Sequence, residues 1–339
     1  MYPCGPVARL RSIMSLLSYL RFHAALQLSL ALESAEETLV GGQAVLEGVM
    51  MRSPHAWGIA IRRPNGELAT HSEPLEKASD KSPWKGWPFI RGIVTLGSAM
   101  VLGFKALRYS ADVALEDEKT ESGEKLEISG WMAAANILLS LGFFIFMYKF
   151  VPFAATRALR HQLPQTSNQF LFALVEGIIR LAIFLAFIWL TSRWSDIRRV
   201  YQYHGAEHKT VFAFENKESL TADAVQRYST FHPRCGTSFL MTVMIISIAV
   251  YALVPVHGFA AGFAARLLLL PVIAGGSYEI IRYAAKRRSS LFALMTAPGL
   301  WLQRITTQPP DDRQVECAIV ALNHAMELEA QRGGELVIA

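Results

Sequence analysis

Two long stretches of this 339-residue chain contain no charged side chain, and they limit the fold more than any other feature. Residues 128–148 form an uncharged run of 21 residues, and residues 235–265 form one of 31. A helix needs about 20 apolar residues to cross the hydrocarbon core of a bilayer. The chain therefore predicts a mainly α-helical, polytopic membrane protein.

Four segments have the length and apolarity of membrane-spanning helices: about 130–152, 169–192, 237–256 and 263–284. A further helix at 87–108 has Arg91 and Lys105 near its ends and contains glycines that suit close helix packing. This extra helix could be re-entrant, half-buried or a full span. We expect a helical bundle built from the four spans and this helix.

Residues 57–71 have a different pattern, in which apolar and polar or small residues alternate on both sides of Pro64-Asn65-Gly66. Alternation, a turn and alternation again predict a β-hairpin near the N-terminal part of the chain. Near the other end, apolar residues at helical spacing follow Asp311, and Asp311 and Gln314 have the spacing of a capping box. An amphipathic helix is expected there.

The regions predicted from these patterns are four: an N-terminal extension at 1–38, a β-hairpin with a membrane-associated helix at 39–125, a four-span membrane domain at 126–290 and a C-terminal tail at 291–339. The extension mixes arginines with apolar residues, which is compatible with an interfacial amphipathic helix. An upstream start codon that adds residues outside the fold is the alternative.

The formal net charge is +5, and basic residues gather near helix ends, as at 286–288. This pattern favours membrane lipid head groups as partners over nucleic acid, for which no motif is present. A homo-oligomer or a membrane-protein partner is left open. The lysine and arginine bias predicts that the 193–236 loop and the C-terminus face the cytoplasm from the inner membrane. Three distant cysteines predict reduced thiols.

The 193–236 loop carries the residues that suggest chemistry. His204 and His208 are four residues apart, so on a helix they project from one face and can share a metal ion. Glu207 precedes the second histidine, which completes the His-x-x-Glu-His pattern of inverted zincins. In that pattern the glutamate acts as general base, so Glu207 is the candidate catalytic residue.

His232 and Cys235 form a second cluster in the same loop, with a familiar zinc-ligand spacing. Together with His204 and His208 they could complete a tetrahedral site, and thiolate with imidazole favours Zn²⁺ as the divalent metal. Four protein ligands would make the site structural, whereas three and a water would make it catalytic. The alternative without a metal is two interfacial histidines and one small buried cysteine.

Ionisable residues inside the predicted spans are costly and need an explanation. Glu176 and Arg180 are four residues apart and could pair with each other. Glu279 lies near a helix end, where Arg282 could offset its charge. The alternative is an intramembrane polar site, with either glutamate as a ligand or proton relay.

Glu47 and Arg52 lie in a glycine-punctuated run at 40–52. Each could be a cap, a surface charge or an additional site residue, and sequence patterns alone do not choose between these roles.

Four motifs resemble the YqhQ-like family of bacterial membrane proteins: residues 41–52, 203–209, 232–237 and 298–303. The resemblance covers about residues 40–330. Members are commonly labelled a domain of unknown function and a predicted metal-dependent enzyme, which implies a metal at the histidine, glutamate and cysteine positions.

The function predicted from these observations is a metal-dependent, hydrolytic membrane enzyme that acts at the cytoplasmic membrane surface on a lipid or a membrane peptide. Two alternatives belong to other classes. One is a non-enzymatic assembly or scaffold protein with a structural zinc site. The other is a transporter that uses Glu176, Arg180 and Glu279.

Overall fold

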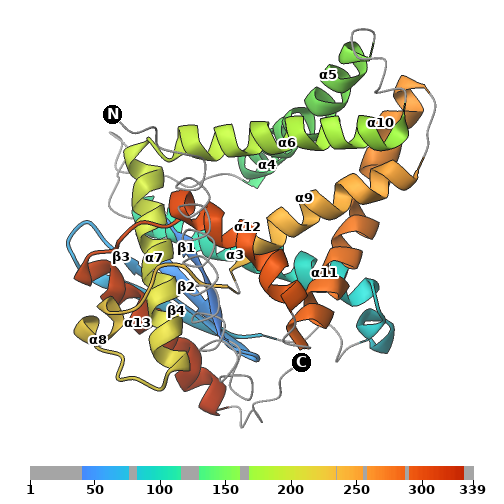
Figure 1. Cartoon of the computed structure of the whole chain (residues 1–339). Helices are drawn as coiled ribbons and strands as arrows, with labels where there is room; N and C mark the ends of the chain where they lie inside the picture. The colour runs from blue at the N-terminus through green and yellow to red at the C-terminus, as the bar shows by residue number, and fades with distance from the viewer. Residues whose placement is uncertain are drawn as a thin grey trace, which may run out of the picture.

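The computed structural model describes residues 40–75, 82–115, 130–160, 168–233, 235–254, 258–286 and 290–331. The extension expected at 1–38 lies outside the described residues. The described chain is mainly helical and has two adjoining parts, one built around a small sheet and the other made of long apolar helices (Figure 1).

The sheet has four antiparallel strands in the order β1-β2-β3-β4: Gly41–Val45, Gly48–Arg52, Ala56–Arg62 and Leu68–Pro74. The predicted hairpin is confirmed as β3 and β4, which pair around a turn where Gly66 has a φ of 89°. That left-handed conformation suits glycine. The sequence pattern does not reveal β1 and β2. The first four residues of β2 are all buried, so its apolar residues do not alternate with polar ones.

Helices cover both faces of the sheet. One face packs against α3 (Ile90–Leu115), and the other packs against α7 (Ser195–Glu215) and α13 (Asp312–Gln331). Neighbouring residues of a strand point to opposite faces, so Met50 joins the core under α3 while Met51 joins the core under α7 and α13. The result is a three-layer arrangement with β1 and β4 as the edge strands.

The amphipathic helix predicted near the C-terminus is confirmed as α13, and so is its capping box. Gln314 N donates to Asp311 Oδ1 at 2.8 Å, and Asp311 N donates to Gln314 Oε1 at 3.0 Å. The helix lies so close to β3 that a Cβ on Gly58 would be 2.6 Å from the Ala321 carbonyl oxygen. Close packing on the sheet therefore requires glycine at this position.

Four helical segments are long and apolar enough to cross a membrane: Ile90–Ala114, Ala134–Leu159, Gln169–Thr191 and Phe259–Tyr283. They are formed, in order, by α3, by α4 (Gly130–Ile145) with the π-helical turn η2 (Phe146–Phe150) and α5 (Val151–Leu159), by α6 (Gln169–Thr191), and by α10 (Phe259–Leu268) with α11 (Leu270–Lys286). The remaining helices are η1 (Pro83–Gly86), α8 (Ala222–Gln226), α9 (Gly236–Leu253) and α12 (Ser290–Thr306).

The expected spans at 130–152, 169–192 and 263–284 coincide with membrane-length helices. The segment expected at 237–256 is the helix α9, Gly236–Leu253, which has 18 residues. The extra helix expected at 87–108 is α3. The mainly helical membrane fold with a small sheet is confirmed, while the regional boundaries at 38, 125 and 290 stay predictions.

The helix α3 packs against different partners along its length. Near its start, Gly92 lies against Tyr278 of α11, where an added Cβ would be 2.9 Å from the Tyr278 Cβ. Farther along, Leu102, Ala106 and Val113 belong to the core on the sheet. An open sheet edge is not compatible with the hydrocarbon core of a bilayer. The contacts with the sheet favour a half-buried helix, whereas the length and apolarity of residues 90–114 suit a full span, so the three alternatives stay predictions.

Candidate metal centre

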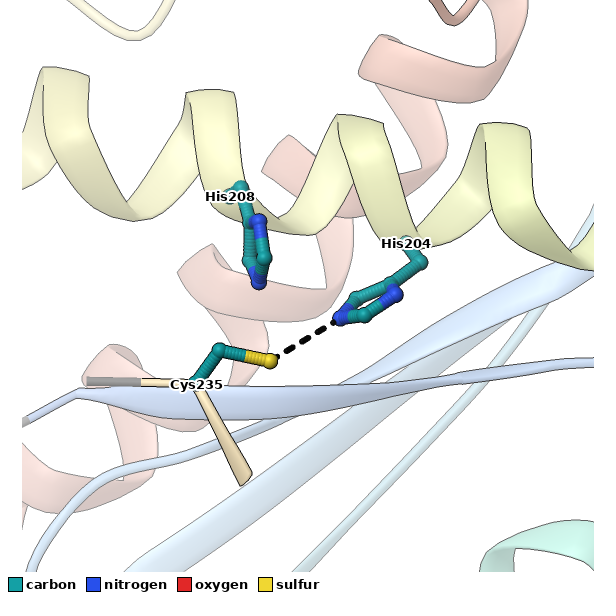
Figure 2. A group of neighbouring side chains, drawn as sticks. All are labelled: His204, His208 and Cys235. Carbon is teal, nitrogen blue, oxygen red and sulfur yellow. Dashed lines mark hydrogen bonds between the residues drawn. The ribbon is translucent and has the colours of Figure 1, made fainter. Parts of the chain in front are cut away.

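Two histidines and one cysteine from distant segments converge beside the sheet (Figure 2). His204 and His208 project from one face of α7, and their ring centroids are 4.4 Å apart. Cys235 is the residue immediately before α9. One ligand atom from each of the three side chains lies within 4.8 Å of the others. We refer to these three residues as the His-His-Cys group.

Backbone carbonyls fix the orientation of both imidazoles. His204 Nδ1 donates to the Thr306 carbonyl at 2.8 Å, and His208 Nδ1 donates to the Thr230 carbonyl at 2.5 Å. Because a carbonyl oxygen can only accept, the ring hydrogen is on Nδ1, and each neutral ring carries a lone pair on Nε2. These two carbonyls belong to the backbone, so no sequence motif predicts their positions.

The donor atoms of the group fit a bound cation. His204 Nε2 lies 3.3 Å from Cys235 Sγ. His208 Nε2 is buried and has no hydrogen-bond partner among the described residues, which is a costly arrangement for a polar atom. One cation would satisfy both lone pairs and the sulfur. Three protein ligands of this kind suit zinc and leave one coordination position for water or substrate.

The electrostatics of the group favour the protonation states that bind metals. Burial lowers the pKa of His208 to about 4, and the neighbouring His204 adds to this shift. Burial alone would raise the pKa of Cys235, but interactions with the His208 ring and with Thr237 outweigh it, and the pKa lies below its ordinary value. Neutral imidazole and thiolate are the metal-binding forms.

Glu207 lies next to the group. Its Oε2 is 3.9 Å from His204 Nε2, and burial raises its pKa to about 7. The carboxylate accepts a hydrogen bond from the backbone of Gly42 in β1. A Cβ on Gly42 would be 2.8 Å from Glu207 Cγ, so the strand can approach only because this residue is glycine. The prediction from sequence missed Gly42, whose signal is the Gly-Gly pair that opens the first family motif.

His232 lies beside the group but outside it. Its ring centroid is 5.7 Å from that of His208, and its Nε2 is 3.5 Å from Glu215 Oε2. The side chain of Gln303 holds the His232 backbone: His232 N donates to Gln303 Oε1 at 2.7 Å, and Gln303 Nε2 donates to the His232 carbonyl at 2.9 Å. The structure thus brings three of the four expected ligands together. Gln303, the last residue of the 298–303 motif, holds the backbone at His232 in place.

Glu47 and Arg52 have separate surroundings. Glu47 occupies the turn between β1 and β2 with a φ of 52°, and its carboxylate accepts hydrogen bonds from Nε and Nη2 of Arg199 on α7. The hydrogen bond to Glu47 raises the pKa of Arg199, and the pair ties α7 to the sheet. Arg52 lies at the end of β2, is exposed, and makes no hydrogen bond or ion pair with a described residue.

The intramembrane pair Glu176–Arg180 forms as expected, with Arg180 Nη2 donating to Glu176 Oε1 at 2.8 Å. Arg266 of α10 joins it, because its Nε is 2.9 Å from each oxygen of the Glu176 carboxylate. All three side chains are buried. The prediction from sequence missed Arg266 as a partner, although it is the charge that ends the 31-residue uncharged run. A ligand or proton-relay role for Glu176 stays a prediction.

Glu279 pairs with Arg91 of α3, whose Nε donates to Glu279 Oε1 at 2.7 Å and whose Nη2 donates to Oε2. The expected offset by Arg282 is therefore not the main contact. The reason is tertiary packing, since α3 lies against α11 and brings Arg91 to the carboxylate.

A cavity of about 970 Å³ opens beside the His-His-Cys group. Residues 40–44, Leu96–Leu107, Val200–Val211 and the start of α9 contribute to its lining, together with Glu207 and the group itself. Arg52 is the one described lining residue with a permanent positive charge. The cavity gives a ligand access to both the candidate metal ligands and the glutamate.

Comparisons with known proteins identify a family without an assigned activity. The model described as "Protein of unknown function (DUF1385)" matches residues 87–328. The chain is 36% identical over 298 residues to "Uncharacterized protein YqhQ" of Bacillus subtilis (strain 168), covering 86% of this chain and 93% of that relative. No solved structure matches the chain. The chain therefore belongs to the DUF1385 family and resembles YqhQ over most of its length.

Proposed function

We propose that this membrane protein is a metal-dependent hydrolase in which His204, His208 and Cys235 hold one divalent ion, with zinc as the best fit. One observation carries the proposal. Two imidazoles are fixed through Nδ1 by backbone carbonyls, so that both Nε2 atoms lie near Cys235 Sγ, and His208 Nε2 has no other partner among the described residues. An oriented set of lone pairs is what a metal ion requires.

The chain supplies the groups needed for hydrolysis next to this site. When bound, zinc acts as a Lewis acid and lowers the pKa of water. Glu207, held by the Gly42 backbone, is in position to accept a proton from water and to return it to the leaving group. We therefore assign Glu207 as the general base of the proposed enzyme.

The number of ligands supports a catalytic site over a structural one. Among the described His, Cys, Asp and Glu residues, only the three members of the group converge as candidate ligands. A structural zinc site normally has four protein ligands, whereas a catalytic site keeps one position open. The cavity beside the group would give substrate access to that position.

The proposed site lies where apolar helices end. Cys235 immediately precedes α9, and α7 begins three residues after the end of α6. This placement supports action at a membrane surface, with membrane lipids around the apolar helices. The lysine and arginine bias of the 193–236 loop and the C-terminal side supports the cytoplasmic face of the inner membrane.

Metal analysis of detergent-purified protein that has never met a chelator tests the proposal. We expect about one equivalent of zinc in the wild type and in Glu207→Gln, and less than about a tenth in His204→Ala. Glu207→Gln should stay folded but lose hydrolysis of a panel of ester and peptide substrates. A scaffold with a structural zinc would instead keep its cellular function in Glu207→Gln. Wild-type protein without a transition metal would refute the proposal.

A further inference from the structure

The cavity beside the His-His-Cys group is lined by most of β1, an edge strand that pairs with β2 on one side only. The helices α3 and α7 cover opposite faces of the sheet, and both also line the cavity. Its third wall is formed by residues 40–44, which include most of the edge strand β1. The space is therefore lined by residues of α3, of α7 and of the edge strand β1, with the start of α9 beside them. Figure 1 shows where these elements lie.

The edge of β1 offers backbone hydrogen-bonding groups to this space. Val45 and Gly48 flank the two-residue turn between β1 and β2, and such a pair exchanges both backbone hydrogen bonds. Because the pattern alternates, Gly42 and Ala44 turn their N–H and C=O groups away from β2. The bond from Gly42 to the Glu207 carboxylate agrees with this direction. Backbone groups at such an edge need partners.

The two edges of the sheet differ in a way that matters for strand addition. β4 carries Glu73, which pairs with His71 and with Lys105 of α3, and charged side chains discourage pairing at an edge. The sequence of β1 is Gly-Gly-Gln-Ala-Val, without any charge and with little side-chain bulk. Of its two N–H groups that face away from β2, that of Gly42 already donates to Glu207, so an incoming chain would pair with the Ala44 N–H, on the side where the candidate catalytic groups lie.

We propose that the cavity binds an extended, apolar polypeptide segment as a fifth strand on β1, and that the bond hydrolysed is a peptide bond. This inference rests on the proposed hydrolase and names its substrate class. Main-chain hydrogen bonds would supply the affinity, and alternate side chains would enter the walls of the cavity. The α3 wall offers Leu96, Met100 and Phe104, which suit apolar side chains.

The reaction balances with water as the only co-reactant. The water oxygen bonds to the carbonyl carbon of the segment, and the carbon–nitrogen bond breaks. Glu207 accepts a proton from the water and delivers it to the departing nitrogen. The second proton of the water also ends on the departing nitrogen, so the products are a carboxylate and an ammonium group, and nothing is oxidised or reduced.

Arg52 gives one end of the cavity a preference for negatively charged groups. It lies opposite Gly41 in the strand register, at the start of β1, and makes no ion pair with a described residue. A guanidinium that faces a cavity and has no ion-pair partner among the described residues can bind a carboxylate of a ligand. The segment is therefore expected to carry an acidic side chain or its carboxyl terminus near Gly41.

Binding to the inactive Glu207→Gln protein tests the inference separately from catalysis. The probe is a fluorescent apolar peptide of about ten residues, the length of a long strand, with a C-terminal carboxylate. Two matched probes carry N-methyl groups on the odd or on the even residues. Strand addition predicts that one methylated probe binds about tenfold more weakly or worse, while the other binds nearly as the parent does, because only alternate N–H groups face β1. Fluorescence anisotropy in nanodiscs measures this.

Equal binding of the two methylated probes would overturn the inference. It would also be overturned if phosphatidic acid displaced the parent probe and both methylated probes equally well, because that result would indicate a lipid site. Ala44→Pro, which removes an N–H facing the cavity, should weaken parent binding, whereas Arg52→Gln should weaken it only when the probe has its carboxylate. If alternation is seen but wild-type protein holds no metal, the strand site stands and the hydrolase proposal fails. If metal is bound without alternation, the reverse holds.

Discussion

Two buried polar clusters in this protein are built on opposite principles. In the apolar helices, the Glu176 carboxylate accepts hydrogen bonds from Arg180 and Arg266, and only Arg180 Nε lacks a partner among the described residues. In the His-His-Cys group, His204 Nε2 and Cys235 Sγ contact each other, while the buried Nε2 of His208 has no hydrogen-bond partner among the described residues. The charges of the first cluster pair with one another, as in a structural element, whereas we propose that the second binds an additional group.

The largest expected effect comes from breaking the cluster around Glu176. Glu176→Gln removes the only carboxylate that Arg180 and Arg266 share in the described structure, which leaves two buried guanidiniums facing each other. Removing one partner of a buried ion pair typically costs about 3–5 kcal/mol. We expect a much lower yield of monodisperse protein and a lower thermal midpoint in detergent.

The matched control is Glu279→Gln, which breaks the more exposed pair with Arg91. This pair is only partly buried, so Glu279→Gln should lower the thermal midpoint much less than Glu176→Gln does. If Glu176→Gln were equally stable, the cluster would not be a structural element, and the transporter alternative would gain support.

The next-largest effect is on zinc content, and it distinguishes the proposed metal ligands from the neighbouring His232. His208→Ala should bind less than about a tenth of an equivalent of zinc, because it removes one of three ligands. His232→Ala should keep most of the metal per folded molecule, because the His232 ring faces Glu215. Metal content of the monodisperse fraction decides this. Metal loss in His232→Ala with retention in His208→Ala would reverse the assignment.

The smallest expected effect is on stability in acid, and it comes from Glu329 of α13, whose carboxylate accepts hydrogen bonds from Ser53 and His55. Burial alone would raise the pKa of Glu329, but hydrogen bonds from Ser53 and His55 outweigh it, and the pKa is lowered. The unfolded chain therefore binds more protons in acid than the folded one, and this contribution to stability is present above a pH of about 4.3. It is lost as the pH falls through the lower folded value.

Glu329→Gln should flatten this acid dependence without changing metal content. Stability as a function of pH between about 5 and 3, compared with the wild type, measures the effect. An unchanged slope in Glu329→Gln would show that Glu329 does not pin α13 to the sheet.

The sequence predicts those parts of the fold whose signal is local. The β3–β4 hairpin follows from alternation and its turn, and α13 follows from its capping box. The strands β1 and β2 escape prediction because they are five residues each and their sequences, Gly-Gly-Gln-Ala-Val and Gly-Val-Met-Met-Arg, do not alternate between apolar and polar residues. The three alternatives for α3 could not be separated from its sequence, because its second half packs on residues far away in the chain.

The same distinction applies to the candidate site. The four-residue spacing of His204 and His208 fixes a shared face of a helix, so their approach could be predicted. Either His232 or Cys235 could have joined them. The choice depends on the backbone at His232, which Gln303 of α12 holds with two hydrogen bonds, and the spacing of residues along the sequence cannot predict such a contact. Arg266 was missed for the same reason, since its partner Glu176 is 90 residues away.

X-ray absorption spectroscopy at the zinc edge tests the central claim most directly, on protein purified without chelator. We predict one sulfur ligand at about 2.3 Å and two imidazole nitrogens at about 2.0–2.1 Å, with the remaining position filled by a light atom from outside the protein. The sulfur signal should vanish in Cys235→Ser. A metal-free protein, or a spectrum without sulfur in the wild type, would contradict the account.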